Sequence, residues 1–207
     1  KSIVHEGDVE AAFNAAKKTY SIDYRNDYVY HAQMEPLNAV VSISDDGSSA
    51  EVWAGTQGAP GARSAAAKAL GLDESNVKLN PCYLGGGFGR RSMSDYVTEA
   101  ALLAKSIKRP LKLIWTREDD LQYGAFRPIS LQRMQAAVDE NGNVSAWRHD
   151  IVGPGGGLLA SGAKTEYYSF PNQQIVVKGV DHGIRTKHWR SVGHGPNKFA
   201  IESFIDE

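Results

Sequence analysis

Apolar residues recur three or four positions apart in several parts of the chain, and this spacing predicts helices. Asp8 can cap the first of them, and Gly71 is suited to end the second. Ser94 or Asp95 can cap the third, which stops before Pro110. The predicted helices are residues 9 to about 18, 62–70, 95–107 and a last helix that begins after Pro196.

Other stretches are rich in β-branched and aromatic residues and are bounded by turn signals, as strands are. The firmest prediction is a hairpin, because Asn141-Gly142 separates two apolar runs. The predicted extended segments are two within 28–44, divided by Pro36, and then 50–54, 77–84, 111–115, 129–138, 144–152 and 174–180. We therefore predict an α+β fold with mixed, largely antiparallel sheets and helices packed on one face.

Length and composition agree with a globular chain. Its 207 residues are 42% hydrophobic and 23% charged, which allows one region, 1–207, with two possible lobes of about 1–125 and 126–207. The 23 basic and 24 acidic side chains leave no broad field for nucleic acid, and no apolar run is long enough to predict a membrane span. The absence of an initial Met and an apolar helical pattern that stops at the last residues suggest a piece of a longer protein.

Ligands for a metal are scarce in the sequence. The single cysteine, Cys82, cannot form an internal disulfide or supply an iron–sulfur cluster, and its place in a predicted strand suggests a buried, inert thiol. The six histidines show no HExxH or i, i+4 pairing. His31 and Glu35 share one face of an extended segment, where a structural hydrogen-bonding role is favoured over catalysis.

Glycine-rich turns raise the possibility of a phosphate site, but their spacing does not fit the common motifs. In the run Gly85–Arg91, Arg90 occupies the place of the third glycine of a dinucleotide fingerprint. In the segment 157–165, Ala163 displaces Lys164 from its place in a P-loop. Ser92 and Ser94 lack the G-x-S-x-G elbow of hydrolases. Nucleotide binding and hydrolysis are therefore disfavoured.

Three loops remain: Gly55–Gly58 and Gly85–Arg91, each after a predicted strand, and Trp189–His194 before the last helix. Repeated glycine allows the backbone to approach a flat ligand closely. Phe88 can stack on such a ligand, and the arginines at 90, 91 and 190 can answer its negative charge. The loops either share one site for an anionic cofactor or are three unrelated turns.

Five ordered blocks of sequence resemble the molybdopterin-binding large subunit of the xanthine dehydrogenase and aldehyde oxidase family, most closely the isoquinoline 1-oxidoreductase beta-subunit type. The blocks are Gly7-Asp-Val-Glu-Ala-Ala-Phe13, His31-Ala-Gln-Met-Glu-Pro36, Trp53-Ala-Gly-Thr-Gln57, Leu84-Gly-Gly-Gly-Phe-Gly-Arg-Arg91 and Trp189-Arg-Ser-Val-Gly-His194. Because such subunits are several times longer, the resemblance covers all of this chain but only the earlier part of a molybdopterin-binding region.

The resemblance implies a role for several residues. Gln57 would hydrogen-bond an oxygen ligand on molybdenum, the backbone of Phe88 would donate to an oxo group, and Arg190 would approach from the opposite loop. No side chain would ligate the metal itself, which the pterin dithiolene holds. The implied cofactor-binding residues are Gln57, Gly86, Gly87, Phe88, Gly89, Arg90, Arg190 and Gly193, and the implied substrate-pocket residues are Ser92 and Val192.

The resemblance also implies hydroxylation of an aldehyde or N-heterocycle with oxygen derived from water. The cofactor would be molybdopterin with molybdenum, in the cytosine dinucleotide form, and electrons would pass to iron–sulfur clusters on a small partner subunit. Ser92 stands where xanthine-oxidising members carry a glutamate, which argues against a purine substrate.

No catalytic residue is expected within this chain, because the family's general base lies in a motif without a counterpart before Glu207. The remainder of the molybdenum subunit would supply it, and the isolated chain would turn over little or nothing. The alternative is a non-catalytic cofactor-binding or assembly module that keeps the scaffold without the base. Either the bacterial cytoplasm or the periplasm suits the family.

Overall fold

The computed structural model describes all 207 residues, Lys1–Glu207, which form two compact units. Unit 1 combines Lys1–Val29, Phe126–Lys187 and Ser191–Glu207, whereas unit 2 combines Tyr30–Ala125 with His188–Arg190. Each unit is therefore assembled from segments that are far apart in the sequence.

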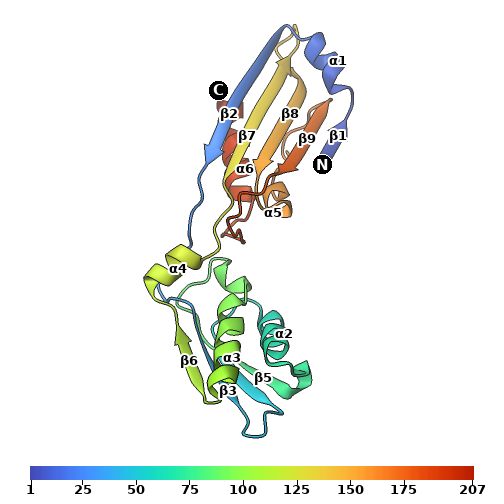
Figure 1. Ribbon diagram of the computed structural model, residues 1–207. Helices are drawn as coiled ribbons and strands as arrows, with labels where there is room; N and C mark the ends of the chain where they lie inside the picture. The colour runs from blue at the N-terminus through green and yellow to red at the C-terminus, as the bar shows by residue number, and fades with distance from the viewer. The chain divides into compact units, whose positions relative to one another are not determined.

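Strands and helices are mixed along the chain, as Figure 1 shows. In chain order they are β1 (Ser2–Glu6), α1 (Val9–Asn14), β2 (Lys18–Asn26), β3 (Asn38–Ile43), β4 (Ala50–Ala54), α2 (Ala59–Leu70), the 3-10 helix η1 (Glu74–Asn76), β5 (Val77–Pro81), the 3-10 helix η2 (Arg90–Ser92), α3 (Asp95–Ile107), β6 (Leu111–Ile114), α4 (Arg117–Tyr123), β7 (Ser130–Val138), β8 (Val144–Gly153), α5 (Gly157–Ala160), β9 (Gln173–Gly179) and α6 (His194–Asp206).

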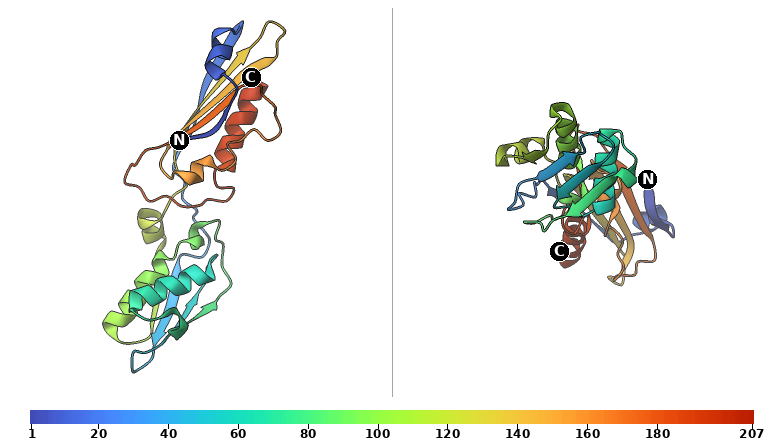
Figure 2. Two further views of the ribbon diagram at one scale, coloured as in Figure 1. Left: turned by 90° about the vertical axis from the view of Figure 1, so that its right-hand side faces the viewer. Right: turned by 90° about the horizontal axis from the view of Figure 1, so that it is seen from below.

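Unit 1 is built on a five-stranded sheet in the order β1-β9-β8-β7-β2, in which only β8 and β9 are parallel. Helix α6 packs on one face, where Trp147 stacks on Phe170 and contacts Phe204. Helix α1 lies against the other face through Val9, which packs on Ala137 and Ala146. Figure 2 shows the two helices on opposite sides of this sheet.

Unit 2 is built on a four-stranded sheet in the order β5-β4-β3-β6, in which β4 and β5 are parallel. Helices α2 and α3 cover one face with small residues, including Ala66, Ala67 and Ala100, which are closed to solvent. Small side chains let the helices pack close to Val41 and Val52 of the sheet. Strand β4, helix α2 and strand β5 form a βαβ unit. The turn Gly55–Gly58 connects β4 to α2, and the glycine run Gly85–Arg91 follows β5.

The predicted α+β class is confirmed, and so are the hairpin of β7 and β8, helix α3, and the stop of helix α2 at Gly71, which has φ +75°. The last helix begins at His194, slightly before Pro196. Pro196 fits the first turn because its missing N–H has no partner there in any helix.

Several predictions about individual elements are wrong. The first helix ends at Asn14, and residues 18–26 form β2, because Ile22 and Tyr24 alternate with polar residues and pack beside α6. Only one strand, β3, forms between Tyr28 and Ser44, since the chain before Leu37 is held by side chains instead of a strand ladder. The short helix α4, which Thr116 and Asp119 cap, was missed.

The predicted strand 77–84 stops at Pro81, which has no N–H for the ladder. Cys82 therefore lies outside the strand with an exposed thiol, which corrects the expectation of a buried one. No helix in the structure is long and apolar enough to cross a membrane.

His149 gives unit 1 a predictable dependence on pH. Its ring is closed to solvent and hydrogen-bonds Gln132 at 2.9 Å, and burial lowers its pKa from 6.5 to about 4. Between these two pH values the unfolded chain binds the proton and the folded chain does not. The stability of unit 1 should therefore be constant above pH 6.5 and fall by about 3 kcal/mol as the pH is lowered to 4.

The measurement is hydrogen exchange of the β7 and β8 amides across this pH range, corrected for the intrinsic exchange rate. In His149→Gln, which keeps a side chain able to bond Gln132, the slope with pH should flatten. An unchanged slope in this variant would contradict the assignment.

Candidate functional site

The glycine run between β5 and α3 has a backbone that ordinary residues rarely adopt. Gly86 and Gly89 have φ of +97° and +99°, and Phe88 between them has φ +50° although it carries a side chain. A positive φ in a phenylalanine costs free energy that the surrounding contacts must offset. The run is therefore held in one shape by contacts at its two ends.

A carboxylate holds the first end and a carboxamide holds the last. The N–H of Gly85 donates to Glu35 Oε2 at 2.8 Å, and the N–H of Gly89 donates to Gln57 Oε1 at 2.9 Å. The N–H groups of Gly86, Gly87 and Phe88 donate to no other group of the chain. Three consecutive free main-chain donors can bind a negatively charged or oxygen-bearing ligand.

Gln57 lies in the turn between β4 and α2, and its side chain is exposed. Because its Oε1 accepts from Gly89, the amide orientation is fixed and its Nε2 remains as a donor without an acceptor in the chain. This approach requires a glycine at position 87, where an added Cβ would lie 2.6 Å from Gln57 Oε1. The structure thus brings two of the three predicted loops together.

The start of the third loop, together with His188 just before it, lies beside the glycine run. An added Cβ on Gly89 would lie 2.2 Å from the carbonyl oxygen of His188, so the two backbones touch. His31 Nε2 donates to that carbonyl at 2.6 Å, and the rings of His31 and Trp189 lie 5.0 Å apart. Arg190 follows directly and is exposed. In unit 2 the segment His188–Arg190 therefore borders the glycine run.

Both arginines of the run point into the protein. Arg90 and Arg91 are closed to solvent, and Arg90 donates to both oxygens of Asp95 at 2.9 and 2.8 Å. The expectation that their side chains answer the charge of a bound phosphate is corrected, since both guanidiniums are buried and bond groups of the chain itself. Arg90 instead stabilises the loop from the protein interior, through its ion pair with Asp95.

The remaining predicted residues are Ser92, Val192 and Gly193, which are divided between the two units. The Ser92 hydroxyl donates to the carbonyl of Gly89 at 2.6 Å, at the base of the glycine run. Val192, with φ +52°, and Gly193 belong to unit 1. Gly193 is buried against the carbonyls of Leu158 and Ser161, and no larger residue would fit there.

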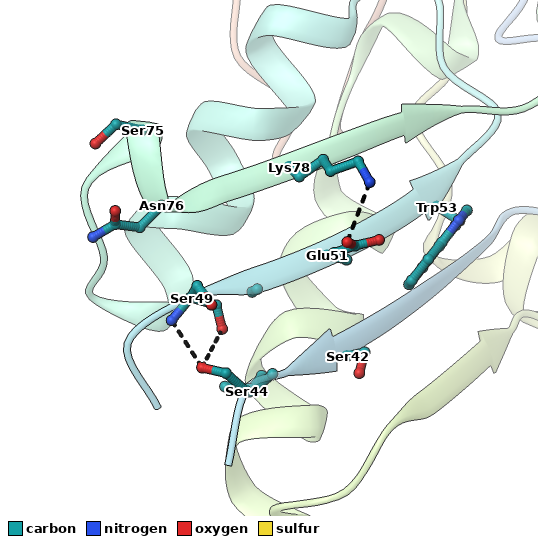
Figure 3. Close-up of a pocket in the computed structure, with 10 residues that line it drawn as sticks. Ser42, Ser44, Ser49, Glu51, Trp53, Ser75, Asn76 and Lys78 are labelled. Atoms are coloured by element: carbon teal, nitrogen blue, oxygen red, sulfur yellow. Dashed lines mark hydrogen bonds and ion pairs between the residues drawn. The ribbon is translucent and has the colours of Figure 1, made fainter. Parts of the chain in front are cut away.

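No three His, Cys, Asp or Glu side chains are grouped to hold a metal ion. A hollow of about 530 Å³ lies elsewhere in unit 2, on the sheet face that α2 and α3 leave open (Figure 3). Trp53 lines it, and Lys78 pairs with Glu51 at 3.2 Å. None of the predicted cofactor-binding residues borders this hollow.

Sequence reasoning missed the residues that support the loops. Tyr30, Gln33 and Arg117 all bond the fully buried Asp120, and Arg117 also donates to the carbonyls of Gln33 and Met34. Apart from Arg117 and Asp120, which are three positions apart, these partners lie between 83 and 90 positions apart, so no local pattern reveals them. The one usable signal was Asp95 in the first turn of a helix just after two arginines.

We predict that Gly87→Ala displaces the Gln57 side chain and leaves the backbone intact. The added methyl group meets only the flexible end of that side chain, so the cost should be about 1 kcal/mol, the value of one hydrogen bond. The side-chain amide resonances of Gln57 should shift in NMR spectra, and the Gly89 amide should exchange faster.

The control is Gly58→Ala, whose methyl group would meet nothing within 4 Å. Equal spectra for wild type and Gly87→Ala would show that Gln57 does not depend on this contact.

The whole chain, residues 1–207, matches the model of the molybdopterin cofactor-binding domain. It is 32% identical over 227 residues to a protein named membrane-bound aldehyde dehydrogenase [pyrroloquinoline-quinone] from Gluconacetobacter polyoxogenes, covering 99% of this chain and 29% of that protein. It is also 32% identical over 210 residues to the isoquinoline 1-oxidoreductase subunit beta of Brevundimonas diminuta, covering 90% of this chain and 26% of that subunit.

Among solved structures, the aldehyde oxidoreductase of Desulfovibrio gigas matches all of this chain with a TM-score of 0.88 at 23% identity, over 24% of its own length. This likeness shows the fold. The chain spans less than a third of the length of these relatives. It belongs to the molybdopterin cofactor-binding domain family, as its resemblance to the large subunits of the xanthine dehydrogenase and aldehyde oxidase family predicted.

Proposed function

We propose that this chain forms one wall of the cofactor site in a molybdenum hydroxylase that oxidises aldehydes or N-heterocycles. The observation that carries the proposal is the row of three free N–H groups at Gly86–Phe88, with the free Nε2 of Gln57 beside it. The printed names of the relatives, an isoquinoline oxidoreductase subunit and an aldehyde dehydrogenase, support this substrate class.

The residues fit molybdopterin because they offer hydrogen-bond donors instead of metal ligands. A metal held by the dithiolene of the pterin needs no side-chain ligand but does need donors toward its oxygen ligands. The backbone of Gly87 approaches the Gln57 carboxamide so closely that an added Cβ would lie 2.6 Å from Oε1, so the free Nε2 of Gln57 lies beside the glycine run. When bound, the group supplies two-electron oxidation of a carbon centre with oxygen from water.

Each residue of the site has a separate task in this proposal. Gln57 Nε2 and the N–H of Phe88 would each donate a hydrogen bond toward the bound molybdenum group and so would hold it. Gly86, Gly87 and Gly89 let the run pack against Phe88, Gln57 and His188, so that its free N–H groups are presented to the cofactor. Exposed Arg190 approaches from the neighbouring segment. The cytosine dinucleotide form of the cofactor and the iron–sulfur clusters of a partner subunit belong to the same proposal.

The general base, which would accept the proton of the attacking water-derived oxygen, is proposed to come from the remainder of the subunit. Glu35 is the carboxylate beside the glycine run, but its oxygens already accept from Asn38, Gly85 and Arg91. The pKa of Glu35 is lowered: burial opposes this, but the bonds from Gly85 and Asn38 and the charge of Arg91 outweigh it. A carboxylate of low pKa with all its bonds in use is a poor base.

The lack of a suitable base near the glycine run also favours the alternative of a non-catalytic module. Such a module would keep the donors of Gln57 and Phe88 and bind or assemble the cofactor without turnover. Supply of a carboxylate from elsewhere in the complete protein distinguishes the two functions.

Metal and pterin analysis of the complete purified subunit tests the proposal directly. We expect about one molybdenum and one pterin per subunit, together with oxidation of aldehydes or N-heterocycles. Pyrroloquinoline quinone without molybdenum, as the name of one relative would suggest, would overturn it. Molybdenum and pterin without turnover would support the module instead.

Gln57→Ala should lower turnover roughly tenfold or more and leave the fold intact, since one donor toward the reacting centre is lost. The measurement is kcat at matched molybdenum content. The control is Gln122→Ala, on the exposed side of α4. Equal kcat values for Gln57→Ala and wild type would remove Gln57 from the site.

A further inference from the structure

The two turns that carry the proposed donors meet at one buried side chain. Arg91 is closed to solvent, and all three nitrogens of its guanidinium donate hydrogen bonds. Nε donates to the carbonyl of Gly86 at 3.0 Å, and Nη1 donates to the carbonyl of Gly55 at 3.0 Å. One planar group thus ties the glycine run to the end of strand β4.

The third nitrogen reaches a third segment. Nη2 donates to the carbonyls of Glu35 and Pro36 at 2.9 and 3.2 Å and to Glu35 Oε2 at 3.0 Å. That same carboxylate oxygen accepts from the N–H of Gly85, at the start of the glycine run. Glu35 is therefore held by Arg91 and in turn holds Gly85.

The backbone of Arg91 fixes the turn that carries Gln57. Its carbonyl oxygen accepts from the N–H of Gln57 at 3.0 Å and from the hydroxyl of Thr56 at 3.2 Å. The hydroxyl of Tyr96 donates to the carbonyl of Gly55 at 2.7 Å and so supports the turn from α3. Side chain and main chain of one residue thus hold both groups of donors.

From these contacts we propose that Arg91 is the positioning residue that sets the distance between the Gln57 amide and the free N–H groups of Gly86–Phe88. It touches neither substrate nor cofactor. Because the donors it places are those of the proposed function, this inference rests on that function. Its structural part, the coupling of the two turns, can be tested without any cofactor.

A planar guanidinium is needed because its bonds diverge in fixed directions. A lysine keeps the charge, but its single nitrogen cannot reach Gly55, Gly86 and Glu35 together. A methionine fills similar volume but leaves the carbonyls of Gly86 and Glu35 without a donor, whereas those of Gly55 and Pro36 keep Tyr96 and Asn38. The two variants Arg91→Lys and Arg91→Met therefore separate charge from geometry.

The control is Arg117→Met. Arg117 also holds carbonyls in unit 2, those of Gln33 and Met34, and pairs with buried Asp120 at 2.8 Å. It bonds neither Gly55 nor Gly86, so its loss should cost stability without moving the two turns relative to each other.

The first measurement is hydrogen exchange by mass spectrometry on the complete subunit without cofactor. In Arg91→Lys, peptides covering 55–58 and 84–92 should both lose protection, whereas in Arg117→Met they should keep it. Loss of protection in only one of the two peptides, or in neither, would overturn the coupling.

The second measurement is retention of molybdenum and pterin during dialysis of the loaded subunit. Arg91→Lys should lose both roughly tenfold faster than wild type, as for the loss of other groups that orient a metal site, and Arg91→Met faster still. If Arg91→Met does not fold, Arg91→Lys carries the test. Retention equal to wild type in a folded Arg91→Lys would refute a positioning role.

These readouts separate this inference from the proposed function. A wild-type subunit that never contains pterin refutes the proposed function, while the exchange of the two turns still decides the coupling by Arg91.

Discussion

Irregular backbone inside a protein must find donors for its carbonyl groups, and in unit 2 this need is met by arginine. The segments 30–37, 55–58 and 82–89 lie outside the helices and strands, so no helix or strand ladder satisfies their carbonyl oxygens. Arg117 bonds the carbonyls of Gln33 and Met34. Arg91 bonds those of Glu35, Pro36, Gly55 and Gly86, so two arginines bond the carbonyls of six residues. Loss of these side chains would leave several of these carbonyls without a donor and would destabilise the loops.

This arrangement explains why the donors of the site are free. The carbonyls of the glycine run and its neighbours are satisfied from the interior, whereas the N–H groups of Gly86, Gly87 and Phe88 are left unpaired. Loops held in this way can present several main-chain donors to one ligand, which a strand or a helix interior cannot do because its N–H groups are already in use. The positive φ of Phe88 is tolerated because both ends of the run are fixed.

Much of this could be predicted from the sequence, and the failures have a common cause. The hairpin at Asn141-Gly142 and the helix stop at Gly71 depend on neighbouring residues, so local pattern was enough. Ordered sequence blocks also located Gln57 and the glycine run. The interior orientation of Arg90 and Arg91 was missed because Glu35, Gly55 and Asp95 become their partners only after folding. Strand β2 was missed because its apolar residues Ile22 and Tyr24 pack beside α6, which lies near the other end of the sequence.

The contact between Gly89 and His188 has a consequence for the order in which the protein is made. Gly89 and His31 leave the ribosome long before His188, because the whole hairpin of β7 and β8 and strand β9 are synthesised in between. Translation at the usual rate leaves these groups uncovered for several seconds. The nascent chain therefore passes through a period in which the glycine run lacks the border that His188 supplies.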